Sequence, residues 1–101
     1  MDILVKPVQF EETIKGSRFL SELFPCDSHA SAREMSKAQK AKYVDSTHVV
    51  HAFVVGKGAE VMGMSDDGEP SGTAGRPVLD VLKGRKCTNC LLTVTRWFCG
   101  T

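Results

Sequence analysis

The chain has few aromatic residues and little net charge, and these two shortages limit what it can bind. Its 101 residues include five phenylalanines, one tyrosine and one tryptophan, and the formal net charge is +1. A dedicated nucleic-acid binder usually has a clearer basic surface and more stacking aromatics. The composition therefore argues against that class. A near-neutral molecule also lacks a strong overall field that would draw it to an anionic membrane.

Long apolar runs and regularly spaced cysteines are also missing. No segment approaches the roughly 20 apolar residues of a membrane span, and residues 1–10 contain Asp2 and no signal-peptide hydrophobic stretch. The four cysteines are Cys26, Cys87, Cys90 and Cys99. They are too few and too unevenly spaced for a disulfide-stapled secreted fold. We expect reduced thiols and a cytoplasmic protein.

The predicted order of elements is β-β-α-β-β-α-β, which indicates a single α+β domain over residues 1–101. Alternation and turn residues predict strands at 5–14, 18–24, 48–55, 60–64 and 90–98, with helices at 31–44 and 75–83. Lys15-Gly16 suits a tight hairpin turn, and Pro7 favours an edge position for the first strand. The last strand is apolar on both faces, as expected of a central position. The expected architecture has both helices on one face of a four- to five-stranded mixed sheet.

The first predicted helix shows two further signals. Ser31 and Glu34 have the spacing of a capping box, in which a hydroxyl and a carboxylate satisfy backbone donors at the helix start. Met35, Ala38 and Ala41 are the expected buried face, and a stripe of basic residues lies outside it. That stripe is Arg33, Lys37 and Lys40. Such a stripe is usually a solvated surface.

Residues 65–75, S-D-D-G-E-P-S-G-T-A-G, concentrate carboxylates, hydroxyls and glycines just before the second predicted helix. The carboxylates of Asp66, Asp67 and Glu69 would suit magnesium or general acid–base chemistry. The alternative, which we favour, is that these carboxylates accept hydrogen bonds from backbone N–H groups and hold the turn in shape. The glycine spacing matches neither a dinucleotide fingerprint nor a P-loop, although free N–H groups at a helix start also suit an anion.

Cys87-Thr88-Asn89-Cys90 is a C-x-x-C without obvious further zinc ligands. His48 and His51 are three apart on a predicted strand, so they point to opposite faces and cannot share a metal. We therefore interpret the two cysteines as half-buried residues flanking a turn, and expect no metal and no cofactor.

Two more side chains invite a specific interpretation. His48 with Ser71 or Thr73 would make a nucleophile and base, but no third member stands at a recognisable spacing. His48 is more simply a hydrogen-bonded residue at a strand start. Arg96 interrupts an apolar strand, and its guanidinium is expected to pair with one of the loop acids.

Four blocks of the sequence resemble the YigZ/IMPACT family. Lys15-Gly16-Ser17-Arg18-Phe19 is similar to its K-x-S-R-F, and Asp45-Ser46-Thr47-His48 to its D-A-T-H. Residues 65–75 reproduce S-D-D-G-E-P-S-G-T-A-G without a break, followed by Pro77-Val78-Leu79 for P-[IV]-L. Residues 88–98 resemble T-N-x-x-x-x-V-T-R-[YW]-F. The blocks occur in family order across nearly the whole chain.

The resemblance implies a fold like the second domain of ribosomal protein S5. The chain also departs from the family pattern at Cys99, which replaces a family glycine. We expect the domain to be incomplete at its C-terminus. From the same resemblance we expect these 101 residues to lack the ferredoxin-like C-terminal domain of bacterial members. Characterised eukaryotic members regulate translation initiation during amino-acid starvation by competing with a kinase for its ribosome-associated activator.

We therefore expect a non-enzymatic regulator that acts through protein contacts with the translation machinery. One alternative is an RNA-binding module that uses the basic stripe together with Lys83, Arg85 and Lys86. Another is a hydrolase that uses Asp66, Asp67 and Glu69 with His48. The expected partner-binding residues are Ser65, Asp66, Asp67, Gly68, Glu69, Pro70, Ser71, Gly72, Thr73, Gly75, His48 and Arg96. An apolar face left without cover would also favour self-association.

Overall fold

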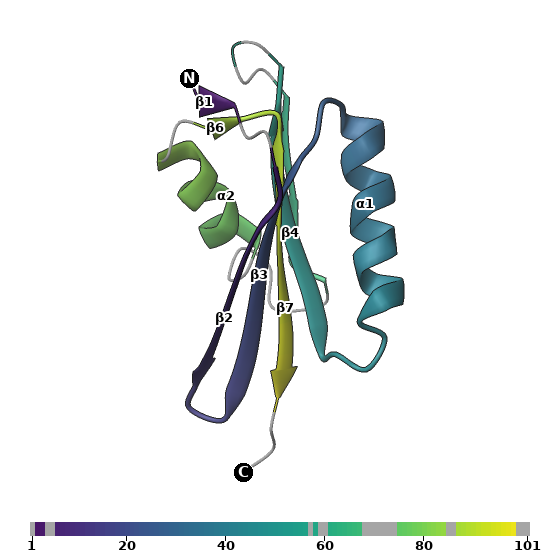
Figure 1. The fold of residues 1–101 in the computed structure, drawn as a ribbon, viewed down its shortest axis with the longest axis vertical. Helices are drawn as coiled ribbons and strands as arrows, with labels where there is room; N and C mark the ends of the chain where they lie inside the picture. Colours follow the sequence, from purple (N-terminus) through teal and green to yellow (C-terminus); the bar gives the residue numbers. More distant parts are fainter. Residues whose placement is uncertain are drawn as a thin grey trace.

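The computed structural model describes residues 2–3, 6–56, 58, 61–67, 75–84 and 87–98. Within them, five antiparallel strands form the centre of the molecule in the spatial order β2-β3-β7-β4-β5 (Figure 1). Their bounds are β2 Val8–Ile14, β3 Ser17–Pro25, β4 His48–Val55, β5 Val61–Ser65 and β7 Cys90–Phe98. A separate parallel pair joins β1 (Asp2–Ile3) to β6 (Cys87–Thr88).

The α+β fold and its five main strands are as predicted, with one correction to the sheet. We expected a mixed sheet, but every neighbouring pair of the five strands is antiparallel. The chain returns as β7 between β3 and β4, which makes it central, and it runs antiparallel to both. The only parallel pairing among the described strands is the short β1–β6 ladder.

The β2–β3 hairpin forms where the sequence predicts it. Lys15 and Gly16 have positive φ angles of 48° and 79°, which matches the twist that a two-residue hairpin turn requires. β2 lies at one edge of the sheet, directly after Pro7. Proline is tolerated there because an edge strand has no neighbour that needs its missing N–H.

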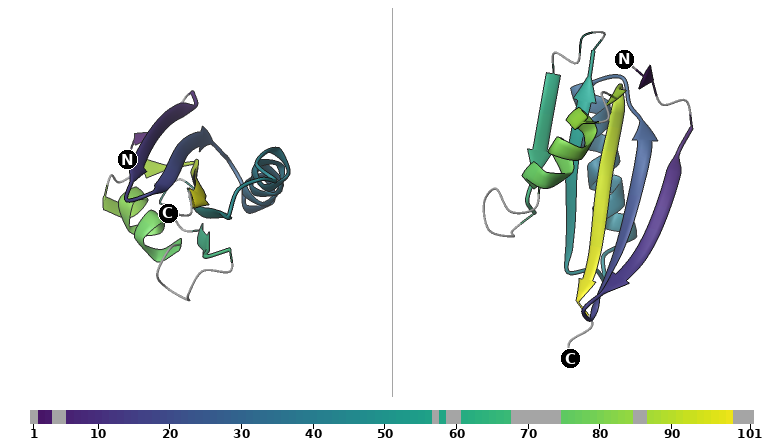
Figure 2. Two further views of the ribbon diagram at one scale, coloured as in Figure 1. Left: turned by 90° about the horizontal axis from the view of Figure 1, so that it is seen from below. Right: turned by 90° about the vertical axis from the view of Figure 1, so that its left-hand side faces the viewer.

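The helices α1 (His29–Lys42) and α2 (Gly75–Gly84) lie on opposite faces of the sheet, not on one face as expected (Figures 1 and 2). Successive side chains of β4 alternate between the two faces. Phe53 and Val55 pack with Ala32 of α1. The α2 cluster contains Ala52, Val54, Leu79, Leu82 and Cys90. Because β4 is apolar on both faces, each face needs its own cover.

The start and the buried face of α1 also differ from the prediction. The N-cap is Ser28, whose side chain accepts the N–H of Ser31 at 3.0 Å, so no capping box begins at Ser31. The buried residues of α1 are Ala32, Ser36 and Gln39. Of the expected face, Met35 is only partly buried and Ala38 and Ala41 are exposed. The helix buries mainly polar side chains, which a search for apolar positions misses.

These polar side chains meet polar partners on the sheet. The Gln39 amide donates to Glu22 Oε1 at 2.8 Å and to Thr93 Oγ1 at 3.1 Å. Gln39, Glu22 and Thr93 are all buried. Tyr43, just beyond the helix, also forms a hydrogen bond with Glu22. Burial, and to a lesser extent this hydrogen bond, raises the pKa of the Tyr43 phenol. A hydrogen-bonded layer therefore joins α1 to β3 and β7.

The segment before β7 ties three strand ends together. Asn89 has a positive φ of 55°, and its side chain accepts the Gly56 N–H at 3.0 Å. The Thr88 hydroxyl donates to the Gly56 carbonyl at 2.5 Å, and the Asn89 carbonyl accepts the Cys26 N–H at 2.9 Å. Cys90 is completely buried, not half-buried as expected. It packs in the α2 cluster because β7 is a central strand.

Candidate functional site

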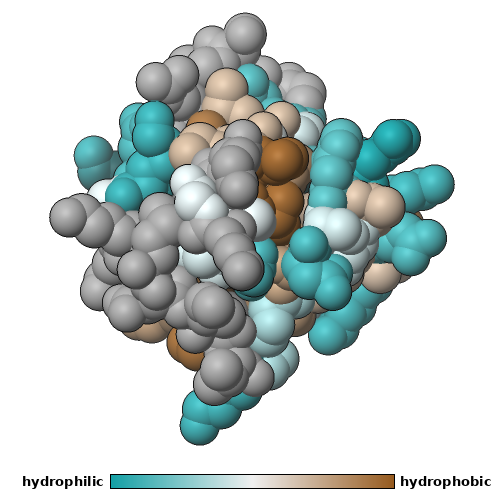
Figure 3. All heavy atoms as spheres, turned by 90° about the horizontal axis from the view of Figure 1, so that it is seen from above, coloured by the Kyte–Doolittle hydropathy of each residue, from teal (hydrophilic) through white to brown (hydrophobic). Residues whose placement is uncertain are grey.

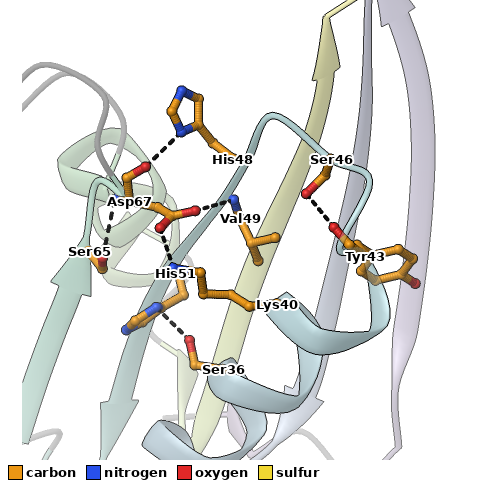
Figure 4. A network of polar contacts seen from close by, with 9 residues as sticks. All are labelled: Ser36, Lys40, Tyr43, Ser46, His48, Val49, His51, Ser65 and Asp67. Carbon is orange, nitrogen blue, oxygen red and sulfur yellow. Dashed lines mark hydrogen bonds and ion pairs between the residues drawn. The ribbon is translucent and has the colours of Figure 1, made fainter.

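A polar cluster forms where the end of β5 meets the start of β4 and the middle of α1 (Figure 4). Its centre is Asp67, which lies two residues beyond the end of β5 and has a positive φ of 47°. The Asp67 N–H donates to Ser65 Oγ at 3.2 Å, and Asp67 Oδ2 accepts the Val49 N–H at 2.7 Å. For Asp67 this confirms that a loop carboxylate satisfies a backbone donor, although the donor belongs to β4.

The second carboxylate oxygen of Asp67 binds Lys40 on α1. Lys40 Nζ lies 2.6 Å from Asp67 Oδ1, and the Asp67 side chain is 18% exposed. Burial alone would raise the pKa of Asp67, but the hydrogen bonds from Lys40 and from Val49 N–H outweigh it and lower that pKa. Asp67 is therefore an anion that links α1, β4 and β5.

The two histidines of β4 lie on opposite sides of the strand, as predicted. His48 is the first residue of β4, and its Nδ1 donates to the Asp67 carbonyl at 2.6 Å. His51 faces α1, and its Nδ1 lies 2.6 Å from Ser36 Oγ. Burial lowers the pKa of His51, so its ring is neutral near pH 7.

Two hollows flank the Lys40–Asp67 ion pair. One, of about 240 Å³, lies between α1 and the β4–β5 edge. From α1 it is lined by Arg33, Ser36, Lys37 and Lys40, and from the sheet by Val49, His51, Ser65 and Asp67. The other, of about 400 Å³, lies at the turn from α1 to β4. The larger hollow is lined by Lys40, Tyr43, Val44, Ser46, Thr47, His48, Val49 and Asp67.

Hydrogen bonds join the turn Asp45-Ser46-Thr47-His48 to the end of α1 and to the end of β7. Ser46 Oγ donates to the Tyr43 carbonyl at 2.6 Å. Thr47 N–H donates to the Arg96 carbonyl at 2.8 Å, and Thr47 Oγ1 accepts the Phe98 N–H at 3.0 Å. This turn therefore fixes the register between the end of β7 and the start of β4.

The structure brings together Ser65, Asp67 and His48 of the expected partner-binding set. Asp66 lies between two of them in the chain, and Gly75 is the first residue of α2. Six expected residues fall outside the described part of the chain, together with the basic pair after α2. These are Gly68, Glu69, Pro70, Ser71, Gly72, Thr73, Arg85 and Lys86.

Arg96 lies opposite His48 on β4 and opposite Phe19 on β3. Its guanidinium carbon lies 5.9 Å from the centre of the Phe19 ring. The ion pair expected between Arg96 and a loop acid stays a prediction, because Glu69 is outside the described residues and the Asp67 carboxylate is bound by Lys40.

The sequence interpretation missed Ser36 and His51 as members of the site and treated Lys40 only as part of a stripe. Ser36 lies one helical turn before Lys40, so both can meet the sheet edge. His51 is the one polar residue between Val49 and Val55 on β4. A histidine inside an apolar strand requires a polar partner, and the facing helix supplies it.

The described parts of the chain hold neither a cluster of metal ligands nor a helix suited to cross a membrane. No group of three or more His, Cys, Asp and Glu side chains is placed to hold a metal ion there. Neither described helix has the length and apolar character that crossing a membrane requires.

The comparisons with known proteins agree with the motifs. A family model for the Impact N-terminal domain matches residues 15–101. The chain belongs to the IMPACT family. It is 38% identical over 92 residues to IMPACT family member YvyE of Bacillus subtilis, covering 91% of this chain and 42% of that protein. It is 36% identical over 96 residues to IMPACT family member YigZ of Escherichia coli, covering 93% of this chain and 47% of that protein.

A solved structure described only as a hypothetical protein has the same fold. Its TM-score is 0.91 at 36% sequence identity, over 98% of this chain and 49% of that one. The chain thus spans about half the length of the relatives it matches.

Proposed function

We propose that this IMPACT-family domain is a non-enzymatic regulator of translation that acts by protein contact with the translation machinery. Family membership supports a shared role with the members known to act in that way. The polar cluster supports the non-enzymatic part, because its groups are engaged in holding elements together. The Asp67 carboxylate accepts from Val49 N–H and Lys40, and its lowered pKa makes it a weak general base.

The Ser36–His51 pair has the distance of a nucleophile and its base but lacks the rest of a catalytic arrangement. Ser36 is buried in the middle of a helix. Among the described residues, no carboxylate is hydrogen-bonded to the His51 ring to orient it. A buried hydroxyl bound to a half-buried imidazole is the expected way to satisfy two polar groups between a helix and a sheet.

The observation that carries the contact proposal is the exposed basic side of α1. Arg33, Lys37 and Lys40 recur at helical spacing and are all exposed. Hydrophilic side chains gather on the α1 side of the molecule in Figure 3. A rigid helix that displays cations on a polar surface suits a transient contact with an acidic protein surface.

The arrangement gives less support to the RNA-binding alternative. That alternative joined the α1 stripe to the basic residues around Lys83. Lys83 is on α2, and α1 and α2 lie on opposite faces of the sheet (Figure 2). The two sets of cations therefore do not make one continuous footprint.

The test is co-sedimentation of the purified chain with ribosomes, followed by cross-linking to identify the component that it touches. We expect Arg33→Glu with Lys37→Glu to lower binding about tenfold, because rim charges set electrostatic attraction. Lys83→Glu is the matched control and should bind like the parent. Cross-links to ribosomal RNA alone, or equal binding of the α1 variant and the parent, would contradict the proposal.

A further inference from the structure

The smaller hollow beside α1 has the charge and the donors of an anion site. It measures about 240 Å³ and lies between α1 and the β4–β5 edge, next to the cluster in Figure 4. Lys40 and Asp67 form an ion pair across its rim and largely cancel each other. Arg33 and Lys37 also line it, and neither has an ion-pair partner among the residues the structure describes. Two positive charges therefore remain uncompensated.

Three other lining residues supply neutral hydrogen-bond donors: Ser36 on α1, His51 on β4 and Ser65 on β5. Ser36 Oγ and His51 Nδ1 share one hydrogen in their 2.6 Å bond. Whichever tautomer His51 adopts, the pair keeps one further polar hydrogen, on Ser36 Oγ or on His51 Nε2. Ser65 Oγ accepts the Asp67 N–H at 3.2 Å, which leaves its own O–H as a donor. Cations together with neutral donors suit an oxyanion.

We infer that this hollow is a site for a terminal phosphate group, either inorganic phosphate or a phosphate monoester. A terminal phosphate carries close to two negative charges at neutral pH, which equals the uncompensated charge of Arg33 and Lys37. A bridging phosphodiester carries one charge, so it leaves one cation unmatched. The volume of about 240 Å³ is below that of typical drug-sized pockets, so the phosphate enters and any larger body stays outside.

Phosphate binding in this hollow does not require the proposed contact with the translation machinery. The binding experiment uses the isolated chain and simple anions, with no ribosome present. If phosphate does not bind, the proposed ribosome contact is not contradicted. If the chain does not bind ribosomes, the phosphate site is not contradicted.

The experiment is an NMR titration of the ¹⁵N-labelled chain at constant ionic strength, with inorganic phosphate, methyl phosphate and dimethyl phosphate in separate arms. We expect saturable shifts with phosphate or methyl phosphate, centred on Ser36, Lys37, His51 and Ser65. Dimethyl phosphate should bind at least tenfold more weakly. Methyl phosphate binding as tightly as inorganic phosphate identifies a monoester site, and tenfold weaker binding identifies a site for the free ion. Either result supports the terminal-phosphate chemistry.

Variants of the lining residues test whether phosphate binds in this hollow. Arg33→Gln with Lys37→Gln should lower phosphate affinity at least tenfold, while Lys83→Gln on the opposite face should not change it. All three substituted positions are exposed, so the variants should keep the dispersed spectrum of the parent. Non-saturating shifts over the whole surface, equal affinity for dimethyl phosphate, or an indifferent double variant would overturn the inference.

Discussion

At the scale of single residues, Asp67 makes the most connections in the site. Its carboxylate accepts the backbone N–H of Val49 on β4 and binds the ammonium group of Lys40 on α1. Its backbone carbonyl accepts a hydrogen bond from His48. These partners come from two separate parts of the sequence, α1 and the start of β4. A positive φ at a non-glycine residue is uncommon, and Asp tolerates it better than most because its side chain can bond locally.

Asp67→Asn should destabilise the protein by about 1 kcal/mol at pH 7. Asparagine can still accept the Val49 N–H but carries no charge for Lys40, which is 57% exposed and therefore well screened. Folding lowers the pKa of Asp67 below 3.8, so its contribution is present above that pH and is lost as pH falls through the folded-state pKa. Urea unfolding of parent and variant from pH 7 to pH 2 measures this. The difference should shrink below pH 3.8.

The matched control is Asp45→Asn, since Asp45 is exposed and forms no ion pair with any described residue. Its stability should follow the parent at every pH. A gap between Asp67→Asn and the parent that is as wide at pH 2 as at pH 7 would show that the charge of Asp67 does not matter.

At the scale of elements, the sequence predicted turns and strand positions well because those signals are local. Lys15-Gly16 identifies its hairpin, and Pro7 its edge strand. The layer under α1 was missed because Gln39 and Glu22 stabilise it only as a pair, and neither has a local signature of burial. The second covered face was predictable in principle. β4 has apolar residues at Val50, Ala52 and Val54 and also at Val49, Phe53 and Val55, which is the pattern of a strand covered on both sides.

The polar layer gives an element-scale prediction. Gln39→Leu should cost about 1–3 kcal/mol, because it leaves the buried Glu22 carboxylate without its amide donor. Replacing both partners, with Gln39→Leu and Glu22→Leu together, should recover part of this loss, since no charged group then remains buried at that position. Chemical denaturation of the two single variants and the double variant forms a double-mutant cycle. Strict additivity in that cycle would show that the two side chains do not interact.

At the scale of the whole molecule, α2 covers only part of its face of the sheet. It packs against Ala52 and Val54 of β4, with Leu23 and Leu92 at the margin of the cluster. Farther along the same face, large apolar side chains of β2 and the end of β7 are exposed. These are Val8, Phe10, Ile14 and Phe98, at 51%, 60%, 48% and 61%. The strand register places Ile14, Ser17 and Phe98 in one row across β2, β3 and β7.

The exposed apolar side chains of β2 and β7 lead to the prediction that the 101-residue chain self-associates at high concentration. Exposed aromatic and branched side chains lie beside the open edge of β2, and both features favour association. Sedimentation velocity should show a sedimentation coefficient that rises with concentration. Phe10→Lys with Phe98→Lys should hold the chain as a monomer, because a buried ammonium opposes the contact. Val81→Lys on α2 is the control, since Val81 is 54% exposed but on the helix, and it should associate like the parent. A parent chain that stays monomeric over the whole concentration range would show that these exposed apolar side chains are tolerated in water.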